Sequence, residues 1–579
     1  MRMWLGIWLT AAAMAAQVCA ASAARAAEPW TQAELRRFAR DLGEYVTAHH
    51  IRRDPKSPQD GMVHKWYRPR DGRWVLDTRR NMLGDGAWFA DALCLYYRAT
   101  REPWALGVLR KHPLPFYQRV LLGSDQLFGV SKGICPLWWG DGAAVTRDGG
   151  VVKDFPKPPR MTSNALALDL ATMLMSAGLL CPDAEAGGAA ACLLRGDRAC
   201  YDDPTVPLAL GVAVAMLAND EMLQTRCLPL IPWQSYDGPG GALAGALCHN
   251  RTNSVSAALE ETMLNYRMHV LAQPSQPLGA DFAKSFIAAV FTSLRLADLW
   301  HDNGPRQPGL TPFDDAALTV GEKLAFYRSD KPALSPGSRH GPMLLCGAAI
   351  ALQLMEAFSA AWESWYREHH AADARVSGRF ADLPVLAKSG LVEMAWTTSS
   401  LLVRARGPLK LLLASATPGD DASATVTLDA AGRATAVSGR GEALRIVAAP
   451  QPDGRVELEL PFTMAKLQKR WLNAVEDSRW IARLDDGKPS GLLFLSRPET
   501  VRARLALELS DGLRFWQKVF NDKGHVPAGI SIGKSPAGAD AELSDAAGYA
   551  FLIAAIAEYT VWLNGERDWD LALKVQAKP

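Results

Sequence analysis

The densest group of polar side chains in the N-terminal two thirds of the chain is Cys248–Asn253, directly ahead of a predicted helix. Its arginine, Arg251, offers a bidentate fork to a carboxylate, and His249 and Asn250 can donate to the same group. Neutralising the carboxylate of a sugar acid makes the proton on the adjacent carbon removable. A tyrosine or histidine then takes this proton and returns one to the leaving oxygen. The segment therefore predicts β-elimination at a uronic acid, with Tyr236 as the preferred loop tyrosine. The alternative is a helix-capping loop with a surface arginine.

Two further loops carry related groups at the predicted starts of apolar helices. In Arg160–Asn164 we expect Ser163 to cap a helix and Asn164 to point into a cup, where helix N-termini favour anions. Arg339 and His340 repeat the Arg-plus-His pattern before another apolar helix. These three residues are predicted to act with the first group. The alternative is that they are ordinary capping or surface residues.

Two Gly-Asp-Gly loops combine carboxylates with tryptophans. One holds Asp85 and Trp88, and the other holds Trp138, Trp139 and Asp141. Flat apolar rings stack on sugar rings and carboxylates bind hydroxyls, so both loops predict substrate binding in a sugar cleft. The alternative for each loop is an Asp-capped turn with tryptophan in the core.

The elements that would position these loops are mainly helical from residue 31 to about 370. Thr31–Glu34 forms a capping-box pattern that opens a helix to about His49. Some of the following helices are apolar on most of their circumference and others are amphipathic, as inner and outer helices of a double ring would be. The remaining predicted helices are Gly86–Thr100, Trp104–Leu122, Asn164–Leu180, Val206–Leu217, Ser254–Ala272, Asp281–His301, Asp314–Ser329 and Met343–His370.

The pattern changes to short period-two segments between about Ser389 and Glu508, which predicts an antiparallel β-sandwich. Helices return at Gly512–Phe520 and Ala546–Trp562. The fold class is therefore mainly α: an (α/α) toroid or incomplete barrel with an inserted sandwich-like domain. The predicted domains are a leader (1–26), a toroid (27–388), the sandwich (389–508) and helices packing back on the toroid (509–579). The predicted strands are 399–406, 409–414, 424–428, 444–448, 455–460, 479–484, 492–496 and 501–507.

The chain has 579 residues, of which 49% are hydrophobic, and this balance excludes disorder and a multi-span membrane protein. Residues 1–26 are typical of a secretory leader cleaved near Ala26, which predicts a periplasmic or secreted protein. Formal charge is +2, and it becomes zero when Arg2 and Arg25 leave with the leader. A neutral mature chain has no basic field for nucleic acid or an anionic membrane, so neither is an expected partner.

Nine cysteines include eight outside the leader, an even number that is compatible with disulfides in an oxidising compartment. Two of Cys181, Cys192 and Cys200 are expected to form a disulfide. Cys94 and Cys346 lie in apolar runs and are expected to be buried thiols. No sequence pattern of metal ligands is present, and we expect neither a metal nor a cofactor.

These loops and helices resemble those of bacterial polysaccharide lyases with an (α/α) toroid fold, which act on alginate, glucuronan, heparin-like and related uronate polymers. The resemblance lies in Leu83–Thr100 (LGDGAWFADALCLYYRAT), Pro115–Phe128 and Pro136–Met175, which holds WWGDG and SNALALDLATMLM. It implies a site of Asn, His, Tyr and Arg, for which the matching positions are Asn164, His249, Tyr236, Arg251, Arg339 and His340. The helices after the β region depart from the common plan, which leaves the polymer open.

Two other functions fit the same residues. The first is a glycoside hydrolase in which Asp85 and Asp141 act as acid and base, with the carboxyl groups roughly 5–9.5 Å apart. The second is a non-catalytic protein that binds carbohydrate in the cup. The expected partner in all three cases is a polysaccharide or oligosaccharide, acidic in the first. The sequence leaves the oligomeric state open.

Overall fold

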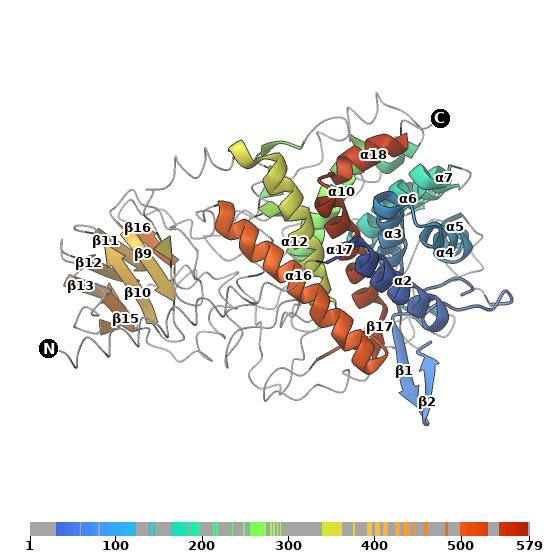
Figure 1. Ribbon diagram of the computed structural model, residues 1–579, viewed down its shortest axis with the longest axis horizontal. Helices are drawn as coiled ribbons and strands as arrows, with labels where there is room; N and C mark the ends of the chain where they lie inside the picture. Colours follow the sequence, from blue (N-terminus) through green and yellow to red (C-terminus); the bar gives the residue numbers. More distant parts are fainter. Residues whose placement is uncertain are drawn as a thin grey trace.

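The computed structural model describes most of residues 30–122, 164–196, 255–273, 339–361, 498–530 and 543–576. It also describes short segments between 138 and 144, 212 and 217, 234 and 248, and 278 and 294, and strands between 375 and 484. This part of the chain is mostly helical with antiparallel sheets (Figure 1). Predicted elements at 281–301, 314–329 and 492–496 lie largely or wholly outside it.

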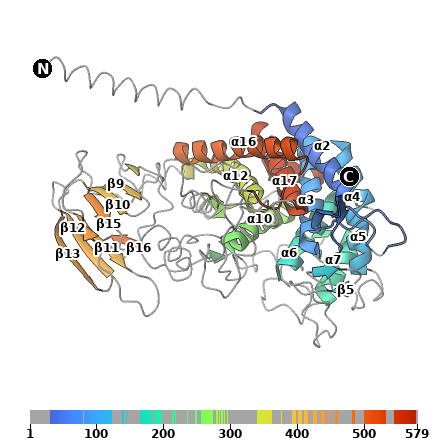
Figure 2. The same ribbon diagram turned by 90° about the horizontal axis from the view of Figure 1, so that it is seen from below.

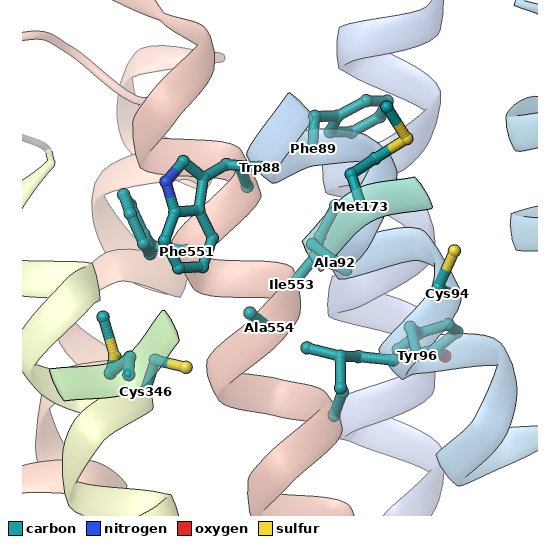
Figure 3. Packing of buried hydrophobic residues seen from close by; sticks show 14 of the residues in the cluster. Trp88, Phe89, Ala92, Cys94, Tyr96, Met173, Cys346, Phe551, Ile553 and Ala554 are labelled. Carbon is teal, nitrogen blue, oxygen red and sulfur yellow. The ribbon is translucent and has the colours of Figure 1, made fainter. Parts of the chain in front are cut away.

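Five largely buried helices in the described part of the chain form a closed ring, each packing against the next and the last against the first. In ring order they are α3 (Leu83–Thr100), α6 (Asn164–Leu180), α10 (Val255–Ala272), α12 (His340–Ala357) and α17 (Ala546–Leu563). Helices α3, α6, α12 and α17 are mostly apolar on every face, and α10 is largely buried although it carries Asn265 and Arg267. Such burial requires enclosure by other helices. Figure 3 shows part of this packing, with Trp88 against Phe551 and Met173 beside Phe89.

The five ring helices run in the same direction. Near their beginnings, Trp88 of α3 contacts Phe551 of α17, with ring centroids 4.7 Å apart. Further along, Ser176 of α6 donates to Asp91 of α3, and Gln353 of α12 donates to Glu558 of α17. The N-termini of all five helices therefore lie at one end of the ring. The end of α3 contacts α18 (Asp568–Gln576), which lies at the opposite end (Figure 1).

Amphipathic helices pack on the outside of the ring. They include α2 (Gln32–His49), α4 (Pro103–Lys111), α5 (Pro113–Leu122), α7 (Ala186–Gly196) and α16 (Pro498–Lys523). The capping box predicted for α2 is confirmed, because Thr31 Oγ1 accepts from the Glu34 amide and Glu34 accepts from the Thr31 amide. Figure 2 shows α16 lying across α12 and α17.

Helix α17 is long and apolar enough to cross a membrane by length and composition alone, but 89% of its apolar window is buried inside the protein. It contacts α2, α3, α12 and α16. Its apolar surface is therefore explained by its place in the ring.

Strands between residues 375 and 484 form two sheets. The first has the order β14-β15-β10-β9-β8, with β9 (Leu391–Trp396), β10 (Ser400–Ala405) and β15 (Val456–Glu459) antiparallel in its middle. The second has the order β13-β12-β11-β16, from β11 (Leu409–Ala414), β12 (Ser423–Leu428), β13 (Ala434–Arg440) and β16 (Ile481–Leu484). The short outer strands of the first sheet are β8 (Arg375–Val376) and β14 (Arg445–Ile446).

Two sequence predictions were wrong. Val501–Leu507 is helical within α16, which also crosses the boundary expected after Glu508. The predicted helix Trp104–Leu122 is broken at His112, because Pro113 follows and begins α5.

Cys181 and Cys192 are not bonded to each other, and Cys200 lies outside the described residues. Cys94 and Cys346 are buried thiols, as predicted.

The contact between α2 and α4 depends on a glycine. A Cβ on Gly43 would overlap the ring of Trp104, whereas a Cβ on Gly107, also helical, would meet nothing within 4 Å. We expect Gly43→Ala to lower the free energy of unfolding by about 1–3 kcal/mol through overpacking. Gly107→Ala should raise it by about 0.5–1 kcal/mol through helix propensity. Urea titrations followed by circular dichroism test both, and equal effects of the two variants would contradict the packing argument.

Candidate functional site

Charged side chains from the N-terminal end of the ring meet in one buried network. Asp85, in the first turn of α3, accepts from Lys65 Nζ at 3.0 Å and from Arg339 Nη1 at 2.8 Å. The other guanidinium nitrogen, Nη2, lies 2.7 and 2.9 Å from the two carboxylate oxygens of Glu260 on α10. We call Lys65, Asp85, Glu260 and Arg339 the N-end cluster. It joins four chain segments that are far apart in the sequence.

The side chains of the N-end cluster are buried, so each of their charges needs a partner. The side chains of Asp85, Lys65 and Arg339 are 0–5% exposed, and Glu260 is the most accessible member at 13%. Buried charges are tolerated only when paired and hydrogen-bonded, and the cluster matches two cations with two carboxylates. The planar guanidinium uses its two terminal nitrogens to hold two different carboxylates, with Nη1 on Asp85 and Nη2 on Glu260.

Asp169 on α6 lies beside this cluster. It is buried, and its Oδ1 has no hydrogen-bond partner among the described residues. Burial raises the pKa of the Asp169 carboxyl well above its ordinary value, and the negative charge of Glu260 raises it further. Arg339 acts in the opposite direction. Asp169 is therefore a buried carboxyl group whose surroundings favour its protonated form, next to the N-end cluster.

The two glycines around Asp85 are explained by close packing. A Cβ on Gly84 would lie 2.9 Å from Asp169 Oδ2, and one on Gly86 would lie 2.5 Å from the Tyr117 hydroxyl. This hydroxyl donates to the carbonyl of Leu83 at the start of α3. Asp85 is not the N-cap of the helix, because that position is Met82. The Gly-Asp-Gly sequence thus allows α3 to approach α5 and α6 closely.

Asp85 and Trp88 do not offer the surfaces that we predicted for sugar binding. Lys65 and Arg339 occupy both oxygens of Asp85. Trp88 is 2% exposed, and its ring contacts both Phe551 and the guanidinium of Arg267. Its indole N–H donates to Glu260 Oε1 at 2.9 Å, which ties it to the N-end cluster. Both residues are therefore buried within the site and bind its other side chains.

Arg339 and His340 are also brought to this end. Arg339 is the N-cap residue of α12 and His340 its first residue, and both are buried. With two carboxylates already bound, the Arg339 guanidinium holds segments together, and we assign it a positioning role. Its plane lies over the ring of Phe551, 5.9 Å from the centroid.

The second Gly-Asp-Gly loop begins beside the first. Strand β4 (Trp138–Gly140) pairs with β3 (Asn81–Met82), which leads directly into α3, and Trp139 is opposite Asn81. The Asn81 side chain accepts from the amide of Lys65 and donates to the carbonyl of Asp77. The backbone of the tryptophan pair is therefore next to the N-end cluster, whereas the tryptophan side chains and Asp141 lie outside the description.

The remaining predicted site residues are placed only through their neighbours. Asn164 is the first residue of α6, but its side chain is not described. Strand β6 (Gln234–Ser235) pairs with β7 (Leu247–Cys248), and Tyr236 and His249 are the residues that follow these strands. Strand β7 contacts α10, the helix that carries Glu260. Tyr236, His249, Asn250 and Arg251 themselves lie outside the described residues.

Sequence reasoning missed Lys65, Asp169 and Glu260. A recognisable feature existed for Asp169, which is the only charged residue in the apolar helix Asn164–Leu180. A lone carboxylate in such a helix must have a partner or a raised pKa. Lys65 precedes a hairpin and has no such local feature. No group of three or more possible metal ligands occurs among the described residues.

Comparison of the chain with protein-family models, with curated proteins and with solved structures gave no match. The function proposed below therefore rests on the residues and their arrangement.

Proposed function

We propose that this protein is a secreted polysaccharide lyase that cleaves a uronic-acid-containing polysaccharide by β-elimination. The observation that carries the proposal is the convergence of five parallel helix N-termini on the N-end cluster. The segments with the predicted catalytic groups join these same ends: Asn164 begins α6, and Arg251 lies just ahead of α10. Positive helix ends favour a carboxylate substrate, which is what β-elimination at a uronate requires.

In this proposal the N-end cluster positions the loops and the loops carry out the chemistry. Arg251, Asn164 and His249 neutralise the substrate carboxylate, so that the neighbouring carbon-bound proton becomes acidic. Tyr236 or His249 removes this proton, and the sugar oxygen leaves with a proton returned to it. The reaction forms a carbon–carbon double bond in the product and consumes no water. No cofactor takes part in these steps.

We further propose that the ring is the inner layer of an (α/α) toroid and that the two sheets form an inserted sandwich-like domain. The closed ring of parallel helices and the amphipathic helices packed outside it support the first part. The antiparallel pairing of most strands in both sheets supports the second. The leader-like residues 1–26 support a periplasmic or secreted location, where an acidic polymer is accessible.

Product analysis tests the reaction. Incubation with alginate or glucuronan should yield oligosaccharides that absorb in the ultraviolet because of the conjugated double bond. We expect Tyr236→Phe, His249→Ala and Arg251→Ala each to lower kcat by at least about 100-fold. Asn564→Ala, at the far end of α17, should leave kcat unchanged. New reducing ends without ultraviolet absorbance would contradict the lyase proposal.

A glycoside hydrolase is the second candidate, favoured specifically by Asp169. A hydrolase needs a carboxyl group with a raised pKa as its acid, and the pKa of the Asp169 carboxyl is raised by burial and by the neighbouring Glu260. This version differs from the pair Asp85 and Asp141 expected from the sequence, because Asp85 is bound by two cations. It predicts that Asp169→Asn abolishes release of reducing sugar, with no ultraviolet-absorbing product from the parent enzyme.

A further inference from the structure

A β-hairpin projects from the same end of the ring as the N-end cluster (Figure 1). It consists of β1 (Trp66–Arg70) and β2 (Arg73–Leu76), and β1 also pairs with β17 (Ser544–Asp545), which leads into α17. Lys65, whose ammonium group binds Asp85, is the residue immediately before β1. The hairpin is thus anchored on the cluster but is not part of it.

One face of the hairpin is aromatic. Tyr67 and Trp74 lie on the same face and stack with ring centroids 5.3 Å apart. His49 also stacks with Tyr67 at 5.0 Å, and His525 meets Trp74 edge-on at 4.9 Å. Trp74 is 38% exposed, one of few large apolar side chains so exposed in the described part of the chain. An exposed indole held by neighbouring rings is a surface on which a sugar ring can stack.

The other face is basic. Arg70 and Arg73 are exposed and directly opposite each other in the ladder. Like charges in this position destabilise a strand pair. Arg70 forms a long, exposed ion pair of 3.9 Å with Asp71, which contributes little. Arg68, on the same face, pairs with Asp77 at 3.2 Å. Three arginines and one aspartate give residues 66–76 a net charge of +2 in a nearly neutral chain.

From this combination we propose that the β1–β2 hairpin is a binding arm for an acidic polysaccharide, outside the proposed catalytic loops. Trp74 stacks on one sugar unit while Arg70 and Arg73 bind carboxylates of the chain. A polyuronate carries both a ring and a carboxylate on each unit, so it matches both faces, whereas a neutral glycan matches only the aromatic one. The inference rests on the proposed function for its choice of a polyuronate, and the arm would hold the polymer at the helix N-termini.

Binding to full-length protein tests the arm without any need for turnover. Affinity electrophoresis in gels containing alginate, glucuronan or neutral dextran measures the dissociation constants. We expect Trp74→Ala to weaken polyuronate binding about three- to tenfold. Arg70→Ala/Arg73→Ala should weaken it about tenfold and reduce its dependence on salt. The matched control Arg37→Ala/Arg567→Ala removes two exposed arginines elsewhere and should leave binding unchanged.

Several results would contradict the proposal that the hairpin is a binding arm. These are no binding of the parent protein to either polyuronate, equal binding in the hairpin variants and the parent, or a loss in the control variant equal to that in the arginine variant. A change of oligomeric state in Trp74→Ala would instead identify the aromatic face as a protein interface. The outcome is separable from that of the proposed function. Polyuronate binding that depends on the hairpin, without unsaturated product, would support the arm and contradict the lyase. Unsaturated product, together with binding that does not depend on the hairpin, would support the lyase and contradict the arm.

Discussion

Arg339→Met is expected to lower the free energy of unfolding by about 3–5 kcal/mol, the usual cost of removing one partner from a buried ion pair. The guanidinium binds Asp85 at 2.8 Å and Glu260 at 2.7 Å, so its loss leaves two carboxylates with one cation, Lys65. Lys65 still binds Asp85 at 3.0 Å, whereas Glu260 loses the contacts of both its carboxylate oxygens with the guanidinium. The penalty therefore falls mainly on Glu260, which also accepts the indole N–H of Trp88.

Three companion variants identify the cause. Arg339→Lys keeps the charge but loses the planar fork, and it should cost less than Arg339→Met. Adding Glu260→Gln to Arg339→Met removes the unpaired charge, so the double variant should lose less than the sum of the two single losses. Arg36→Met is the surface control. Its ion pair with Glu102 spans 3.7 Å with the arginine 48% exposed, and its loss should cost at most about 1 kcal/mol.

Chemical denaturation followed by circular dichroism provides these values. If Arg339→Met and Arg36→Met cost the same, the N-end cluster does not hold the ring helices together. Activity measurements on the same variants add a second readout. A positioning role for Arg339 predicts that Arg339→Lys retains part of the activity that Arg339→Met loses.

The helices of the ring could be predicted from the sequence because apolar character and helix length agree in them. Asn164–Leu180 has the predicted bounds, and α17 extends one residue beyond the prediction. Val501–Leu507 was misread because apolar residues recur there at both spacings. Val501, Leu505 and Leu509 are buried on one side of α16, whereas Val501, Ala503, Leu505 and Leu507 also satisfy period two.

Residues of the candidate site could be predicted only where a single loop carried side chains typical of catalysis or binding. Asp85, Trp88 and Arg339 were identified because each stands at the start of an apolar helix. Their roles were not predictable, since these depend on partners 20 to 254 residues away in the chain. The sequence does not single out Glu260 as a site residue, because a glutamate near a helix start is an ordinary surface residue. Which residues pair in this way depends on the order of the helices around the ring, and the periodicity of the sequence alone does not give that order.

A second buried polar group, at the opposite end of the ring, predicts how stability changes with pH. Glu558 of α17 accepts from Gln353 Nε2 at 2.8 Å, and Gln353 Oε1 accepts from the amide of Asp568. Asp568 is paired with Arg98 at 3.1 Å. Burial raises the pKa of Glu558 from 4.5 to about 8, and the charge of Asp568 raises it further against the effect of Arg267.

The sign follows from proton counts. Between about pH 4.5 and 8 the folded protein keeps a proton on Glu558 that the unfolded chain has released. Stability from this group is therefore complete below pH 4.5 and is lost as the pH rises towards 8. Two buried histidines act in the opposite direction at lower pH. Burial lowers the pKa of His50 to about 3 and that of His64 to about 4, so stability falls as the pH drops below about 6.5.

Glu558→Gln isolates the first effect, because both histidines remain in the variant and cancel in the comparison with the parent. Glutamine resembles the protonated carboxyl and keeps an oxygen that can accept from Gln353. We expect the variant to match the parent near pH 5 and to exceed its unfolding free energy at pH 9 by on the order of a few kcal/mol. Glu44→Gln, exposed on α2, is the control and should follow the parent throughout. Urea titrations at pH 5, 7 and 9 measure the three profiles. If the stability of Glu558→Gln declined in parallel with that of the parent above pH 5, Glu558 would not be the source of the pH dependence.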